Sequence, residues 1–143
     1  MSYSIKLQLY QTNPSRGHFR PVETTCWNYA NGATWSHGDG ACLLTMGGSG
    51  TSGTLRLLSD KGERIIIAIG VDNQKRWCDV VTGLAPEQTG VVINGEYYNK
   101  GQRAYMREKQ LAKYSVTSAA GTKVEVQFTV SDGKDLVANC IIG

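Results

Sequence analysis

Residues 124–130 read Val-Glu-Val-Gln-Phe-Thr-Val, so apolar and polar side chains alternate without a break. The same period of two recurs in residues 3–9 (YSIKLQL). Successive side chains of a β-strand point to opposite faces, so this alternation predicts strands with one buried and one solvated face. Because it is the dominant pattern along the chain, it predicts an all-β fold.

Residues 65–71 (IIIAIGV) form the longest apolar run, and both faces of this predicted strand are apolar. Ile65, Ile67 and Ile69 line one face, whereas Ile66 and Ala68 line the other. We therefore expect this strand to be covered on both sides. Further strand candidates are residues 55–58 and 136–142.

Turn-forming residues separate these runs. Asp-Lys-Gly at 60–62 and Ser-Asp-Gly at 131–133 predict short hairpin connections. Residues 13–17 (NPSRG) and 37–40 (HGDG) separate other runs in the same way. The spacing predicts an antiparallel β-sandwich or barrel.

Residues 102–114 (QRAYMREKQLAKY) break the pattern, because they contain helix formers and neither glycine nor proline. They predict one helix of about three turns. On that helix Arg103 and Tyr114 would lie on roughly one side.

Length and composition indicate a folded globular protein. The chain has 143 residues, 41% hydrophobic and 19% charged, with a formal net charge of +3. This length and apolar content predict a single folded domain, residues 1–143, and exclude a wholly disordered chain. A charge of this size does not by itself point to nucleic acid or anionic membranes.

The sequence shows neither the pattern of a signal peptide nor closely spaced cysteines, and these absences guide the expected localisation and cysteine chemistry. The start, residues 1–6 (MSYSIK), shows no basic segment followed by a long apolar run, so we expect no signal peptide and a cytoplasmic protein. No stretch approaches the length of a transmembrane segment. The cysteines are widely separated, which favours free thiols over a metal cluster or disulfides: Cys26, Cys42, Cys78 and Cys140.

Two segments carry candidate binding chemistry. Residues 45–53 (TMGGSGTSG) combine glycines, which let a ligand approach the backbone, with hydroxyls that donate and accept; a glycine-rich turn with a bulge is the alternative. Residues 71–79 (VDNQKRWCD) combine planar polar groups with Trp77. Such groups hold sugars by hydrogen bonds and by stacking on an aromatic face, although Trp77 is more simply explained as a core residue.

A third cluster joins the predicted helix to the second segment. Arg103 and Tyr114, with Asp79 and Thr82, could hold an acetamido sugar; a solvated helix face with a packed tyrosine explains the same residues.

The sequence gives little support for catalysis, because His18 and His37 lie in turns without a nucleophile elbow and Cys78 has no indicated histidine partner. We therefore expect no catalytic residues, no cofactor and no metal.

Several motifs in order carry a resemblance across nearly the whole chain: residues 29–35 (YANGATW), 44–53 (LTMGGSGTSG), 75–79 (KRWCD) and 138–142 (ANCII). On these, the sequence resembles the fungal fruit-body lectins. The resemblance implies a β-sandwich similar to the actinoporin fold with a short helical connection, a homotetramer, and glycans as partners. It also implies a part in defence against fungus-feeding animals.

The resemblance further implies two sugar sites in each subunit. One, for the T-antigen disaccharide (galactose β-linked to N-acetylgalactosamine), would use Ala30, Ser49, Gly50, Asp72 and Asn73. The other, for terminal N-acetylglucosamine, would use Asp79, Val80, Thr82, Arg103 and Tyr114.

The chain departs from the family pattern near the first of these sites. The family has histidine and tyrosine where this chain has Asp72 and Gln74, and a second glycine where it has Ala33. Aspartate accepts hydrogen bonds where histidine could also donate, a change that bears on affinity or selectivity for the disaccharide.

Two rival functions remain at this point. The first is a sugar-dependent membrane-active or pore-forming protein, which the actinoporin likeness suggests; the alternating N-terminus argues against the amphipathic helix that such toxins use. The second is nucleic-acid binding through a basic segment, whose charges are also typical of a solvated face: Lys100, Arg103, Arg107, Lys109 and Lys113.

Overall fold

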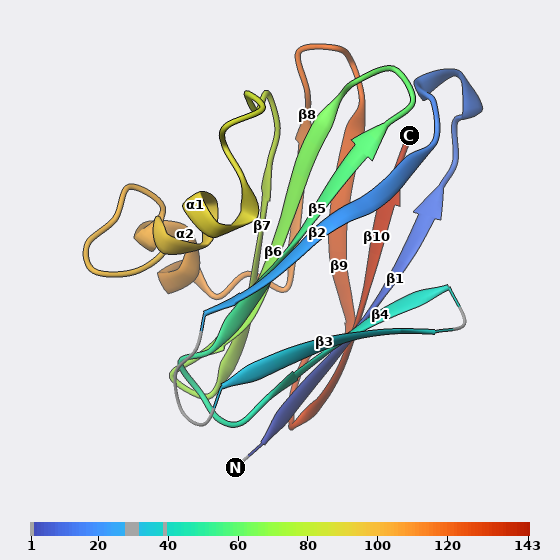
Figure 1. The fold of residues 1–143 in the computed structure, drawn as a ribbon. Coiled ribbons are helices and arrows are strands. Elements are labelled where there is room, and N and C mark those ends of the chain that lie inside the picture. The colour runs from blue at the N-terminus through green and yellow to red at the C-terminus, as the bar shows by residue number, and fades with distance from the viewer. Residues whose placement is uncertain (1, 28–31, 39) are drawn as a thin grey trace.

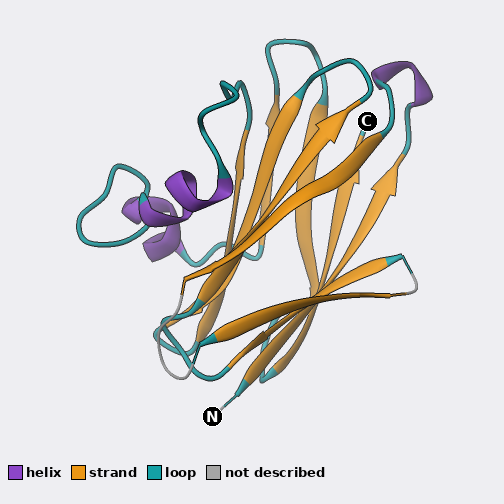
Figure 2. Ribbon diagram, viewed as in Figure 1, coloured by secondary structure: helices purple, strands orange, loops and turns teal. Residues whose placement is uncertain are grey.

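The structure is a computed structural model that describes residues 2–27, 32–38 and 40–143. Its described part folds into two β-sheets that face one another, with the short α-helices at one side and a 3-10 turn at the other (Figures 1 and 2). The predicted all-β sandwich is therefore confirmed.

The larger sheet has six strands in the order β3-β4-β1-β10-β9-β8. One pairing departs from the predicted antiparallel arrangement, because β1 and β10 run parallel, with Ile5 opposite Leu136. The first strand and the last thus lie side by side in the middle of the sheet. The strands are β1 (Tyr3–Gln11), β3 (Ala33–Gly38), β4 (Ala41–Met46), β8 (Lys113–Thr117), β9 (Lys123–Val130) and β10 (Asp135–Ile142).

The smaller sheet has four antiparallel strands in the order β2-β5-β6-β7: β2 (Phe19–Trp27), β5 (Ser52–Ser59), β6 (Arg64–Asp72) and β7 (Lys75–Val81). The two predicted hairpins are confirmed. Residues 60–62 lie in the connection from β5 to β6, and residues 131–133 in the connection from β9 to β10.

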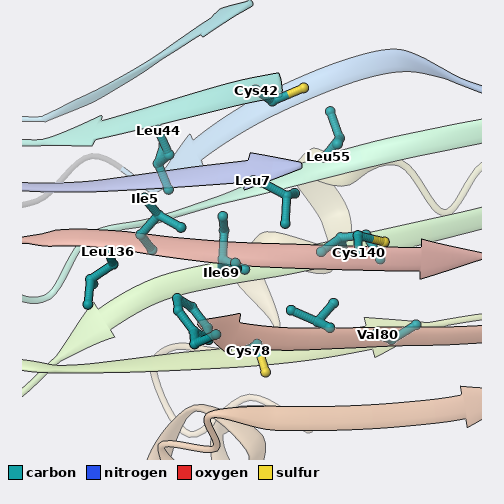
Figure 3. Close-up of a cluster of buried hydrophobic side chains, with 14 of the residues drawn as sticks. Ile5, Leu7, Cys42, Leu44, Leu55, Ile69, Cys78, Val80, Leu136 and Cys140 are labelled. Carbon is teal, nitrogen blue, oxygen red and sulfur yellow. The ribbon is translucent and has the colours of Figure 1, made fainter. Parts of the chain in front are cut away.

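The main core lies between the sheets, and Figure 3 shows side chains from both entering it. The alternation correctly identifies the buried face of β1 and β9: Ile5, Leu7, Val124 and Val126 are fully buried. Towards the strand ends the burial weakens: Leu9 is half-buried, and Val130 is 43% exposed, opposite Val137, where the register with β10 shifts. Cys42, Cys78 and Cys140 are buried free thiols, and Cys26 is a half-buried one, as predicted.

A second apolar cluster lies on the outer face of the smaller sheet. Ile66 and Ala68 meet Trp77, Ile93 and Tyr97 there, and all five are fully buried. Strand β6 is thus covered on both sides, as its sequence predicted. The cover is supplied by α1 (Gly90–Gly95), which packs on β2 and β5, and α2 (Ala104–Lys109), which packs on β7 (Figure 1).

The predicted helix over residues 102–114 is wrong in its length. Helix α2 occupies only its middle, since Gln110 adopts a left-handed backbone (φ 51°) that ends the helix. Tyr114 then belongs to β8, where it pairs with Val126 of β9. Sheet pairing overrides the helix propensity of the last residues, so Arg103 and Tyr114 do not share a helix face. Helix α1 and the 3-10 turn η1 (Pro14–Arg16) were not predicted.

Within the described residues, no helix is long and apolar enough to cross a bilayer. Over the same residues, no group of three or more potential metal ligands comes together.

Gly70 on β6 provides a test of the packing beneath the helices. A Cβ there would lie 2.5 Å from the Ser52 Cβ, 2.7 Å from the Thr51 carbonyl oxygen and 2.8 Å from the Trp77 Nε1. We expect Gly70→Ala to lower the free energy of unfolding by about 1–3 kcal/mol, measured by urea denaturation. Gly38→Ala is the matched control in a strand, because a Cβ there meets nothing within 4 Å. Equal stability of the two variants would contradict this packing.

Candidate functional site

The β6–β7 hairpin presents the first group of predicted site residues. Asp72 pairs with Lys75 at the end of the ladder, and the two residues between them, Asn73 and Gln74, have φ values of 51° and 67°. Two consecutive positive φ values define the tight type I′ turn, which suits the right-handed twist of the strands. Asn73 is exposed at this turn, so its amide faces solvent from a rigid backbone.

The glycine-rich segment lies against this turn. The Ser49 Oγ accepts a hydrogen bond from the Gln74 backbone N–H at 2.8 Å, and the Gly50 N–H donates to the Val71 carbonyl at 2.9 Å. Gly50 has a φ of 94°, a conformation that other residues rarely adopt. The structure thus brings Ser49, Gly50, Asp72 and Asn73 together; Ala30 lies outside the described residues.

Asp72 is held by ionic and polar contacts. Its Oδ1 accepts from the Arg107 Nη1 at 2.6 Å, and its carbonyl oxygen accepts from the Gln110 Nε2 at 2.6 Å. The carboxylate that replaces the histidine of the family pattern is therefore already engaged by a cation. Its other oxygen is the one that a ligand hydroxyl could approach.

A surface depression of about 270 Å³ adjoins this group. The Trp27 and Tyr98 rings stack beside it, 4.2 Å apart and 5° from parallel. Sequence reasoning missed these two residues and the place of Arg107 here, because nothing in their spacing along the chain brings them to the hairpin. The lining residues are Trp27, Gly50, Asp72, Tyr98, Asn99 and Arg107.

The second group centres on Asp79 of β7. Its side chain lies on the outer face of the smaller sheet, only 2% exposed, and its Oδ2 accepts from the Tyr97 hydroxyl at 2.6 Å. The next side chain, Val80, points the opposite way into the main core (Figure 3). Only the backbone of Val80 is therefore on the side of the other site residues. Thr82, half-buried, directly follows the strand.

Arg103 and Tyr114 reach the same cluster from different elements. Arg103 lies at the N-cap of α2, where its Nε donates to the Glu96 Oε1 at 2.7 Å. Tyr114 lies half-buried on β8. Tyr114 packs against the outer apolar cluster, and the charges of Asp79 and Arg103 both act on its hydroxyl. The three residues therefore lie near one another, although through a cap and a strand instead of the predicted helix face. Glu96 and Tyr97, which position this cluster, were not predicted.

Burial raises the pKa values of the carboxyl and phenol groups in and beside this cluster. Desolvation raises the pKa of the Asp79 carboxyl, against the hydrogen bond from Tyr97 and the positive charge of Arg103, which lower it. Burial, with the nearby Asp79 charge, also raises the pKa of the Tyr97 hydroxyl. Burial raises the pKa of Tyr98 to about 12. Both tyrosines therefore remain hydrogen-bond donors at neutral pH.

The structure settles two alternatives that the sequence left open. Trp77 is fully buried and packs against Tyr97 with ring centres 4.8 Å apart, so it is a core residue and does not offer a face to a sugar. Cys78 is also buried, and burial raises its thiol pKa to about 12. A thiol that stays protonated is a poor nucleophile.

Comparison with known proteins now gives the family. The model of the family described as fungal fruit body lectin matches residues 1–140. A lectin of Boletus edulis is 62% identical over 141 residues, 99% of each chain. The crystal structure of wild-type Xerocomus chrysenteron lectin is 65% identical, covers 100% of both chains and superposes with a TM-score of 0.98. The lipid-binding protein Nakanori, 11% identical, shares the fold alone, with a TM-score of 0.62 over 99% of this chain and 71% of its own.

The buried Asp79 carboxyl predicts a pH-dependent stability. Its pKa in the folded protein lies above its usual value of 3.8, so the folded state binds a proton more readily than the unfolded chain. The charged carboxyl thus costs stability above the folded-state pKa, and this loss is recovered as the pH falls toward 3.8.

Asp79→Asn removes this titration while its amide oxygen can still accept from Tyr97. Measured by urea unfolding across the acidic range, the difference in unfolding free energy between wild type and variant should move in favour of wild type as the pH falls. A difference that is constant with pH, or that moves the other way, would contradict the assignment.

Proposed function

The chain belongs to the fungal fruit body lectin family, and from this premise we propose that it binds glycans through two separate sites in each subunit. The first would take the T-antigen disaccharide and the second terminal N-acetylglucosamine. Relatives of the chain are named lectins, proteins that bind sugars without altering them. Carbohydrate binding, and not catalysis, is therefore the activity of the family.

The observation that best supports the first site is the hydrogen bond from Gln74 to Ser49. It fixes the glycine-rich segment against the hairpin turn before any ligand arrives. The Gly50 N–H is already engaged by the Val71 carbonyl, so the Gly50 carbonyl and the exposed Asn73 amide are the groups proposed to meet a sugar. Sugar hydroxyls need such paired donors and acceptors. The adjoining depression, with Tyr98 and Trp27 at its side, offers room for the second ring of a disaccharide.

The second site is supported by the cluster around Asp79. Its carboxylate accepts hydrogen bonds, the Tyr114 hydroxyl both donates and accepts, and Arg103 donates only. Because the Arg103 Nε is engaged by Glu96, its Nη groups are the donors proposed to reach an acetamido oxygen. Thr82 and the backbone of Val80 would complete the contacts.

Binding at each site should be weak. A sugar exchanges hydrogen bonds to water for similar bonds to protein, so each contributes only about 1 kcal/mol. Single sites are expected in the roughly micromolar to millimolar range, about 4–8 kcal/mol. We propose that a homotetramer compensates by engaging several glycans at once, with an avidity gain of about 10²–10⁴-fold.

The rival functions receive less support. Strand β1 pairs on both sides, with β4 and β10, so freeing it as a membrane helix would break the sheet. In the basic segment, Arg103 pairs with Glu96 and Arg107 with Asp72, which reduces the charge available to phosphates. We further propose a cytoplasmic protein that acts on foreign glycans after ingestion or release, in defence of the fungus.

The two sites can be tested separately. We expect Arg103→Ala to weaken N-acetylglucosamine binding about tenfold, because a charged donor is lost, and to leave binding of the T-antigen disaccharide unchanged. Asn73→Gly should do the reverse; glycine keeps the positive φ of the turn and removes only the amide. Isothermal titration calorimetry with each sugar measures both. Equal loss of both sugars in either variant would contradict two separate sites.

Multivalency makes a second prediction. The protein should sediment as a tetramer and agglutinate cells that display T-antigen or terminal N-acetylglucosamine, and the free sugars should inhibit this. The control is Arg103→Ala combined with Asn73→Gly, which should sediment as wild type does and fail to agglutinate. A wild-type monomer that agglutinates, or a tetramer that binds both sugars without agglutinating, would contradict the avidity mechanism.

A further inference from the structure

We infer that Arg107 is a positioning residue on which both proposed sugar sites depend, through contacts of one guanidinium group with the supports of each. This inference rests on the proposed function. Arg107 is not among the residues proposed to hydrogen-bond either sugar, although it lines the depression proposed for the second ring of the disaccharide. Its side chain is 18% exposed, so most of its length lies within the protein, between the hairpin and the segment before α2.

Its contact toward the first site is ionic. The Arg107 Nη1 donates to the Asp72 Oδ1 at 2.6 Å, at the base of the Asn73–Gln74 turn. Asp72 is itself 23% exposed, so water screens this pair less than it screens a surface pair. The contact holds the carboxylate in one orientation and ties the hairpin to α2.

Its contact toward the second site goes to the backbone. The Arg107 Nε donates to the Tyr97 carbonyl at 2.8 Å, and the Tyr97 hydroxyl donates to Asp79 at 2.6 Å. On the first-site side, the guanidinium carbon lies 5.2 Å from the centre of the Tyr98 ring, which borders the depression. Arg107 thus fixes the Tyr97–Tyr98 backbone from which a phenol reaches the buried carboxylate.

Arginine suits this role because its donors diverge from a rigid plane. A lysine ammonium is a point charge on a flexible stem and cannot hold both partners in a fixed geometry. The other side-chain contacts near Asp72 support only the hairpin of the first site. The Gln110 Nε2 donates to the Asp72 carbonyl, and the Arg76 Nη1 donates to the Gln110 carbonyl at 2.8 Å. Among these residues, Arg107 is the one that contacts the supports of both sites.

The test uses Arg107→Gln and Arg107→Lys in the full chain, titrated by calorimetry with the T-antigen disaccharide and, separately, with N-acetylglucosamine. Arg107→Gln should weaken both sugars about fivefold to tenfold. In Arg107→Lys the ammonium should favour the carboxylate of Asp72 over a neutral carbonyl. Disaccharide binding should therefore recover toward wild type, while N-acetylglucosamine binding stays weakened.

Three variants serve as controls. Asp72→Asn should weaken the disaccharide only, and Tyr97→Phe should weaken N-acetylglucosamine only. Arg56→Gln removes another half-buried arginine, which pairs with Glu23 at 3.6 Å on the β2–β5 side, and should change neither affinity. Thermal unfolding of each variant separates loss of binding from loss of fold. If Arg107→Gln does not fold, the unequal recovery in Arg107→Lys still decides the matter.

A double-mutant cycle adds a readout that general destabilisation would not give. For the disaccharide, Arg107→Gln and Asp72→Asn should be non-additive, because they break one contact; for N-acetylglucosamine, the same pair should show the effect of Arg107→Gln alone. Loss of only one sugar in Arg107→Gln, or equal recovery of both in Arg107→Lys, would overturn the inference. A wild type that binds neither sugar would instead refute the proposed function.

Discussion

The burial of β6 on both faces is the constraint on which the rest of the structure depends. One face, with Ile65, Ile67 and Ile69, closes the core between the sheets, and the other, with Ile66 and Ala68, must be covered from outside. Apolar surface left in water would cost about 25 cal/mol for each Å². The segment with α1 and α2 supplies that cover. The same segment brings Tyr98 and Arg107 to the β6–β7 turn and Tyr97 to Asp79 on β7.

Both candidate sites are consequences of this cover. The first lies where the β6–β7 turn meets the glycine-rich segment. The second lies around Asp79 on β7, close enough to Arg103 and Tyr114 for their charges to act on one another. In each, hydrogen bonds within the protein hold part of the polar groups before a ligand binds: Ser49 and Asp72 in the first, Asp79 and Arg103 in the second. Less conformational entropy is then lost on binding. Preorganised polar sites of this kind suit weak single contacts that gain strength by repetition.

Much of the fold could be predicted from the sequence, because alternation and turn residues act locally. The strands at residues 3–9 and 124–130 and the two short hairpins followed from these patterns. The parallel β1–β10 pair could not, since it joins the two ends of the chain. The helix over residues 102–114 was too long because pairing of β8 with β9 outweighs local propensity. Family resemblance suggested the site residues, but the supporting roles of Tyr97 and Arg107 depend on contacts distant in sequence.

The measurement that tests the central claim most directly is a crystal structure of the protein soaked with both sugars together. Two distinct ligands should appear, a disaccharide against Ser49 and Asn73 and a single N-acetylglucosamine against Asp79 and Tyr114, with the protein backbone unmoved. Density for both sugars at one place, or on a surface away from the helical cover of β6, would contradict the account.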